Sequence, residues 1–61
     1  MRTPLAEQAL RDAIHTTLRL LADECEAVII TPRDSSDHRF AVRERAHYEA
    51  LLNRQLARIN N

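Results

Sequence analysis

Glycine is absent from this 61-residue sequence, and proline occurs only at Pro4 and Pro32. An all-β fold needs many tight turns, which these two residue types usually supply, so their scarcity favours helices. Long hydrophobic runs are missing too. The longest one, residues 27–30, is too short to span a bilayer, and residues 1–8 lack the apolar core of a signal peptide. We therefore expect a cytoplasmic protein that does not enter a membrane.

Cysteine occurs once, at Cys25, which excludes an internal disulfide. Cysteine and histidine do not cluster at zinc-binding spacing, and without glycine no loop is suited to cradle a phosphate. We therefore expect no cofactor. Sixty-one residues lie near the lower size limit for a domain that folds alone. With disulfides and metals set aside, association with a second copy or another protein is the remaining way to complete a core.

Lysine is absent as well, so all nine cationic residues are arginine, and nine acidic residues balance them. The charges are unevenly distributed along the chain. Residues 1–31 carry three arginines and five acidic residues, whereas residues 32–61 carry six arginines and four acidic residues. This division suits antiparallel pairing of the two halves, or a basic surface offered to an acidic partner.

Residues 4–30 have the spacing of an amphipathic helix. Thr3 is a suitable N-cap, and Pro4 fits the first helical position, where its missing N–H costs nothing. An apolar stripe repeats at helical periodicity and comprises Leu10, Ile14, Thr17, Leu21, Cys25 and Val28. A shoulder of mostly small residues beside it comprises Ala6, Ala9, Ala13, Leu20 and Ala27. Together they cover about half of the circumference, more than one neighbouring helix occupies, which indicates a bundle.

A second helix is predicted over residues 37–60, after a loop at 31–36. Ser35, Ser36 or Asp37 is suited to cap it. Its apolar positions have helical spacing and comprise Ala41, Tyr48, Leu51, Leu52, Leu56 and Ile59. The opposite side carries a basic stripe that no carboxylate interrupts, formed by Arg39, Arg43, His47, Arg54 and Arg58.

Residues 27–31 leave an alternative open. Thr31 precedes Pro32, which disfavours the helical conformation, so the first helix must stop by about Ile30. Val28, Ile29, Ile30 and Thr31 are all β-branched and suit a strand. Pairing 27–31 with 38–42 would give an α-β-β-α chain. A lone two-stranded hairpin is marginal and the loop lacks Asn-Gly or Asp-Gly, so we favour the helix.

The predicted fold is therefore all-α, with residues 1–61 forming one antiparallel helical hairpin. Two hairpins are expected to pair into a four-helix bundle homodimer. The residues expected in the core and dimer interface are Leu10, Ile14, Leu21, Cys25, Val28, Tyr48, Leu52, Leu56 and Ile59. Cys25 is interpreted there as a small apolar residue rather than a reactive thiol.

Two patterns resemble chemical sites. Glu44 and His47 have the Glu-x-x-His spacing of di-iron four-helix proteins, but the periodicity places His47 among the arginines. Residues 34–38 contain the serine, histidine and aspartate of a hydrolase triad, yet neighbours in one polar loop are typical turn and capping residues. We therefore expect no catalytic residue and no metal site, and the protein is predicted not to be an enzyme.

The predicted function is that of a non-catalytic protein–protein interaction module, such as an adaptor, a co-chaperone or an inhibitor of the kind that phages and plasmids encode. The expected contacts near the loop are Ile29, Ile30 and Phe40. Along the second helix they are Arg39, Arg43, His47, Arg54 and Arg58. In layout, although not in any motif, such a hairpin is similar to dimeric RNA-binding regulators of plasmids and to hairpin co-chaperones of type III secretion needle subunits.

The alternative function is a nucleic-acid-binding regulator that contacts phosphates through the arginine stripe. The zero net charge and the absence of lysine weigh against this alternative. A helix–turn–helix reader also uses a turn of three to four residues, shorter than the predicted loop.

Overall fold

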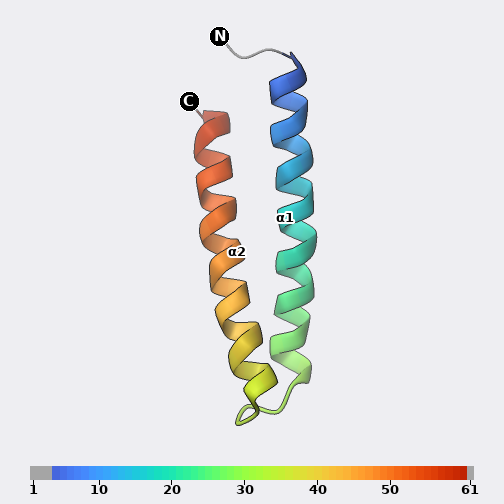
Figure 1. The fold of residues 1–61 in the computed structure, drawn as a ribbon, viewed down its shortest axis with the longest axis vertical. Helices are drawn as coiled ribbons and strands as arrows, with labels where there is room; N and C mark the ends of the chain where they lie inside the picture. The colour runs from blue at the N-terminus through green and yellow to red at the C-terminus, as the bar shows by residue number, and fades with distance from the viewer. Residues whose placement is uncertain (1–3, 61) are drawn as a thin grey trace.

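The structure, a computed structural model, describes residues 4–60 and consists of two α-helices joined by a short loop (Figure 1). α1 comprises Pro4–Ile30 and α2 comprises Ser36–Asn60. The prediction of an all-α hairpin is confirmed. The α-β-β-α alternative is wrong, because no strand occurs in the described part of the chain and residues 27–30 are helical. α2 begins at Ser36, one residue earlier than predicted.

The first helix ends where the sequence indicates. The backbone N–H of Thr31 donates to the carbonyl of Ala27 at 3.0 Å, and the Thr31 hydroxyl donates to the same oxygen. Pro32 has no N–H and disfavours helix at the residue before it, so the helical pattern stops there. The β-branched residues 28–30 nevertheless stay helical, although Ile29 and Ile30 are exposed, because helix propensities are small and extending a helix that has already formed is favourable. Thr3, the predicted cap at the other end, lies outside the described residues.

Ser35 is the N-cap of α2. Its hydroxyl oxygen accepts a hydrogen bond from the backbone N–H of His38 at 3.1 Å, and its carbonyl accepts one from the N–H of Arg39 at 3.3 Å. The Ser35 hydroxyl itself donates to the Pro32 carbonyl at 2.6 Å, and the Ser35 N–H reaches the same oxygen at 3.0 Å. These bonds close the turn and supply one of the N–H groups at the helix start with a partner.

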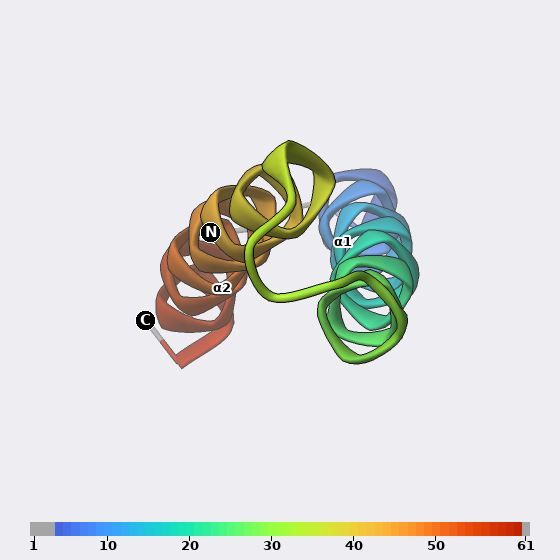
Figure 2. The ribbon, with the colours of Figure 1, turned by 90° about the horizontal axis from the view of Figure 1, so that it is seen from below.

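The two helices lie side by side along their length, in both the side view and the view from the loop end (Figures 1 and 2). At the loop end, the Thr31 hydroxyl lies 3.1 Å from Nδ1 of His38. Because that hydroxyl already gives its proton to Ala27, His38 must be the donor, so its Nδ1 carries a proton. At the far end, Leu10 and Ile59 line one hollow, which brings the first turns of α1 beside the last turn of α2.

Few of the described residues are buried between the two helices of this hairpin. Its only buried apolar residues among those described are Ile14 and Ala41, and two polar residues, Thr17 and Gln55, are buried with them. Most residues predicted for the core are half-buried, namely Leu10, Leu21, Cys25, Val28, Tyr48 and Leu52. The predicted core residues Leu56 and Ile59 are instead 41% and 45% exposed in the single chain. Two helices in one layer leave them without a covering neighbour.

Candidate binding surfaces

The residues with catalytic or metal-binding character lie in α2 and in the loop before it. Within residues 4–60, no group of three or more His, Cys, Asp or Glu side chains gathers where it could hold a metal ion. Glu44 is half-buried, whereas His47 is exposed with its ring set edge-on to Tyr48 at a centroid distance of 5.4 Å. At the loop end, the Ser35 hydroxyl takes part in the capping bonds of α2, and the ring of His38, in the first turn of α2, bonds to Thr31 of the loop.

Two helices side by side leave two broad faces open to contact. Near the loop, one face is hollowed between Ile29 of α1 and Val42 and Arg45 of α2. At about 100° per residue, Leu18 lies within about 20° of Ile29 because the two are eleven residues apart. Leu56 stands in the same relation to Arg45. We call this surface the Leu18 face, and its apolar residues are Leu18, Cys25, Ile29, Val42 and Leu56.

The other broad face follows from the same geometry. Leu20 is two residues after Leu18, and Phe40 is two residues before Val42, so each lies about 160° around its helix from that neighbour. His47, Arg54 and Arg58 follow Phe40 at seven, fourteen and eighteen residues, within about 40° of it. We call this surface the Phe40 face, and its residues are Leu20, Phe40, His47, Arg54 and Arg58, all exposed.

The three apolar residues predicted to contact a partner near the loop do not share one surface. Ile29 lies on the Leu18 face and Phe40 on the Phe40 face. Ile30 is a further 100° around α1 from Ile29 and points away from α2. All three are exposed. They are close in the chain, but the rotation of each helix separates them.

The basic stripe of α2 is fully available to a partner. Arg39, Arg43, His47, Arg54 and Arg58 are all exposed. Arg39 and Arg43 lie further toward the outer side of α2, where they line a shallow hollow with His38 and Val42. Among residues 4–60 the one ion pair joins Arg45 Nε to Glu49 Oε1 at 3.6 Å. The stripe therefore keeps its positive charges without a carboxylate partner inside the described chain.

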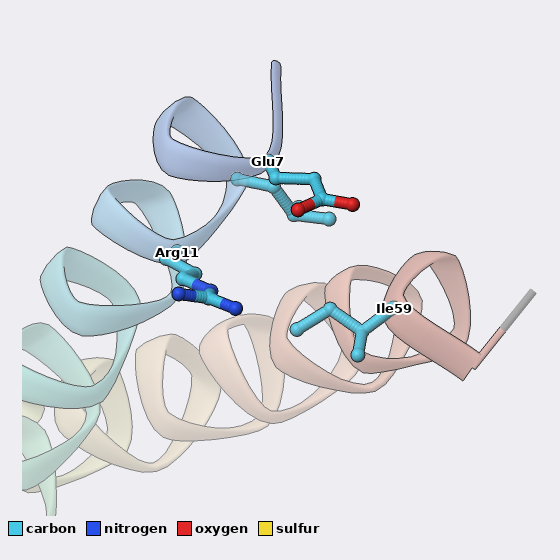
Figure 3. A pocket seen from close by; sticks show the side chains of 4 residues that line it. Glu7, Arg11 and Ile59 are labelled. Carbon is cyan, nitrogen blue, oxygen red and sulfur yellow. The ribbon is translucent and has the colours of Figure 1, made fainter. Parts of the chain in front are cut away.

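The charges on the Leu18 face are balanced, in contrast to the stripe. Near its centre lies the Arg45–Glu49 ion pair. At the end away from the loop, Glu7 and Arg11 line a hollow together with Leu10 and Ile59. Figure 3 shows the side chains of Glu7 and Arg11 extending from α1 above Ile59 of α2.

Gln55 is the buried residue that sequence reasoning missed. Its side chain is only 9% exposed, and within the described structure its Oε1 atom has no hydrogen-bond partner. The signal was present, because Gln55 follows Tyr48 by seven residues and Ala41 by fourteen, on the same apolar line of α2. Because glutamine is polar, the pattern of apolar residues does not mark position 55 as buried. Thr17, buried on α1, satisfies its hydroxyl by donating to the Ala13 carbonyl at 2.8 Å.

Neither α1 nor α2 combines the length and the apolar character that a membrane-spanning helix needs, for the residues that the structure covers. Comparison of the chain with protein-family models, curated proteins and solved structures finds no match.

Proposed function

We propose that this chain is a non-catalytic protein–protein interaction module, acting as an adaptor, a co-chaperone or an inhibitor by occupying the surface of another protein. In this proposal it is cytoplasmic and works as a homodimer, in which two hairpins form a four-helix bundle. The Phe40 face and the arginines beside it then contact the partner.

The observation that carries this proposal is the amount of surface the hairpin leaves exposed. Its accessible surface is 4973 Å², against roughly 4,100 Å² for a typical folded monomer of this mass. Large apolar side chains contribute to that excess, including Leu18, Leu20, Ile29, Phe40 and Leu56. Apolar surface of this kind marks sites where another chain binds.

The chemistry of the Phe40 face suggests which partner it would bind. Phe40 supplies an exposed aromatic ring, and aromatic residues and arginine are enriched where interfaces derive most of their binding energy. Arg54 and Arg58 supply planar guanidinium groups that pair with carboxylates in two-point contacts. An acidic protein surface with an apolar centre would complement this face.

The test is affinity capture from cells of the native host, followed by mass spectrometry. Three baits are compared: the unaltered chain, the double variant Arg54→Ala/Arg58→Ala, and Arg19→Ala, which removes an exposed arginine from α1. We expect one protein to be retained by the first and third baits and lost with the double variant. Recovery of the chain alone, together with measurable turnover of some substrate, would contradict the proposal.

A second candidate function, nucleic-acid binding, is favoured by the exposure of the arginine stripe without carboxylate partners among residues 4–60. Four arginines per chain, Arg39, Arg43, Arg54 and Arg58, would let a dimer neutralise up to about eight phosphates. The logarithm of affinity should then fall against the logarithm of salt concentration with a slope of roughly −5 to −7. Phosphate contacts of this kind carry no base sequence information.

Fluorescence anisotropy with a random duplex and an RNA hairpin, at 50 and 200 mM salt, separates the two candidates. If the stripe binds nucleic acid, Arg43→Ala/Arg54→Ala should reduce the slope and weaken binding to all sequences about equally. Because the net charge is zero, we expect no binding to either probe at 50 mM salt and about 10 μM protein. That result would exclude nucleic-acid binding as the function and would be consistent with the protein-binding proposal.

A further inference from the structure

Either broad face of the hairpin could in principle receive a second copy, and the two differ in shape and charge. We propose that the Leu18 face is the surface through which two copies of this chain meet, so that the Phe40 face stays outward. This inference rests on the proposed homodimer and assigns its interface. Shape and charge support this choice of face, and the exposed area indicates how many copies are needed.

The first observation is shape. A hollow lies near the loop, lined by Ile29 and Val42, and another lies at the far end, lined by Glu7 and Arg11. Glu7 and Arg11 precede Leu18 by eleven and seven residues, which places each of them within about 20° of Leu18 around α1. The two hollows therefore open along the same flank of α1. A surface hollowed at both ends can accept side chains of a facing helix pair.

The second observation is charge. A two-fold dimer brings the same patch of both copies together, so unbalanced charge on the patch repels itself. On the α2 side of the Phe40 face, Arg54 and Arg58 outnumber the half-buried Glu44, which lies four residues after Phe40, and neither arginine has an ion-pair partner among residues 4–60. On the Leu18 face, Arg45 is paired with Glu49, and Arg11 lies beside Glu7. Self-association is therefore less costly through the Leu18 face.

The third observation is area. The hairpin exposes about 900 Å² more than a typical folded monomer of its mass. A standard protein–protein interface covers about 800 Å² on each partner. Burying one broad face against one partner would therefore remove most of this excess area. A single further copy is thus enough, and the second face is left for a partner of another kind.

Two matched substitutions test the assignment. Leu18 and Leu20 are 44% and 39% exposed, sit two residues apart in the middle of α1, and differ mainly in the face they occupy. Glutamate keeps a high helix propensity, so Leu18→Glu and Leu20→Glu disturb α1 to the same extent. In sedimentation equilibrium of the full chain, we expect Leu18→Glu to raise the dimer dissociation constant at least a hundredfold, through buried like charges. Leu20→Glu should change it by less than about threefold.

A second variant covers the case in which Leu18→Glu does not fold. Leu56→Glu places the same charge on the Leu18 face from α2, at a leucine that is 41% exposed. It should weaken the dimer as Leu18→Glu does, while circular dichroism of Leu20→Glu stays that of the unaltered chain. An intact dimer in both Leu18→Glu and Leu56→Glu, or equal weakening by Leu20→Glu, would overturn the assignment of the face. A folded monomer in the unaltered chain would overturn the homodimer itself, which separates the two failures.

Discussion

At the scale of single residues, the loop shows how one hydroxyl can fix a helix start. Ser35 and Ser36 are adjacent and chemically identical, but only the Ser35 hydroxyl accepts the N–H of His38 and donates to Pro32. The sequence limited the cap to three candidates. It could not choose between the two serines, because the choice depends on the turn that brings the Pro32 carbonyl within 2.6 Å.

We predict that Ser35→Ala lowers the free energy of unfolding by about 0.5–2 kcal/mol, the usual cost of losing an N-cap. Ser36→Ala is the matched control. It removes an exposed hydroxyl for which no side-chain hydrogen bond is found within residues 4–60, and should change stability by less than about 0.5 kcal/mol. Urea denaturation followed by circular dichroism measures both. Equal effects of the two variants would show that Ser35 is not the cap in solution.

Gln55 is the residue whose burial is least favourable in the single chain. Its Oε1 atom is enclosed and, in the part of the chain that the structure describes, makes no hydrogen bond. A buried polar atom of this kind costs about 1–3 kcal/mol, whereas an apolar side chain of similar size at the same place carries no such cost.

We therefore predict that Gln55→Leu raises the free energy of unfolding by about 1–2 kcal/mol. Gln8→Leu, at an exposed position of α1, should have an effect within about 0.5 kcal/mol. The midpoint of urea denaturation, at equal protein concentration, gives the comparison. A loss of stability in Gln55→Leu would show that Oε1 has a hydrogen-bond partner in solution, which a second chain could supply.

At the scale of elements, helical periodicity predicted much of the architecture. The stripe containing Ile14, Leu21 and Val28 does face α2, because a spacing of three and four residues can only be satisfied on one side of a helix. The end of α1 was also predictable, because Pro32 acts locally on Thr31. These features depend on residues close together in the chain.

The arrangement of the faces was not predictable in the same way. Ile29 and Phe40 both lie near the loop in the sequence, yet they occupy opposite faces of the hairpin. Which flank of α1 meets which flank of α2 depends on the direction in which the loop turns. That direction is set by the turn at Pro32–Ser35 and the bond between Thr31 and His38, neither of which periodicity reveals.

The inward stripe of α1 can be tested with a matched pair of leucines. Leu21 is half-buried against α2, whereas Leu5 is 79% exposed near the start of the same helix. In the proposed four-helix bundle, we expect Leu21→Ala to lower the free energy of unfolding by about 2–5 kcal/mol, as truncation of a core leucine does. Leu5→Ala should cost less than about 0.5 kcal/mol. A neutral result for Leu21→Ala in chemical denaturation would mean that the stripe does not form the core.

At the scale of the whole molecule, the hairpin is more extended than a compact domain of the same length. Its radius of gyration is 14.3 Å and its extents are 48 × 15 × 12 Å. A compact domain of 61 residues has a radius of gyration of about 10.5 Å. The two helices take up nearly all of residues 4–60, so the hairpin forms a single layer. A second layer restores the usual ratio of interior to surface.

We propose that this chain is completed by a second copy of itself. The most direct test measures mass and helicity together, by sedimentation equilibrium and circular dichroism of the unaltered chain from about 50 μM to below 1 μM. When folding and association are linked, dilution must lower both together. We predict a dimer at micromolar concentration, with loss of helix as the dimer dissociates. A mass of one chain, with full helicity retained across the whole range, would contradict the claim.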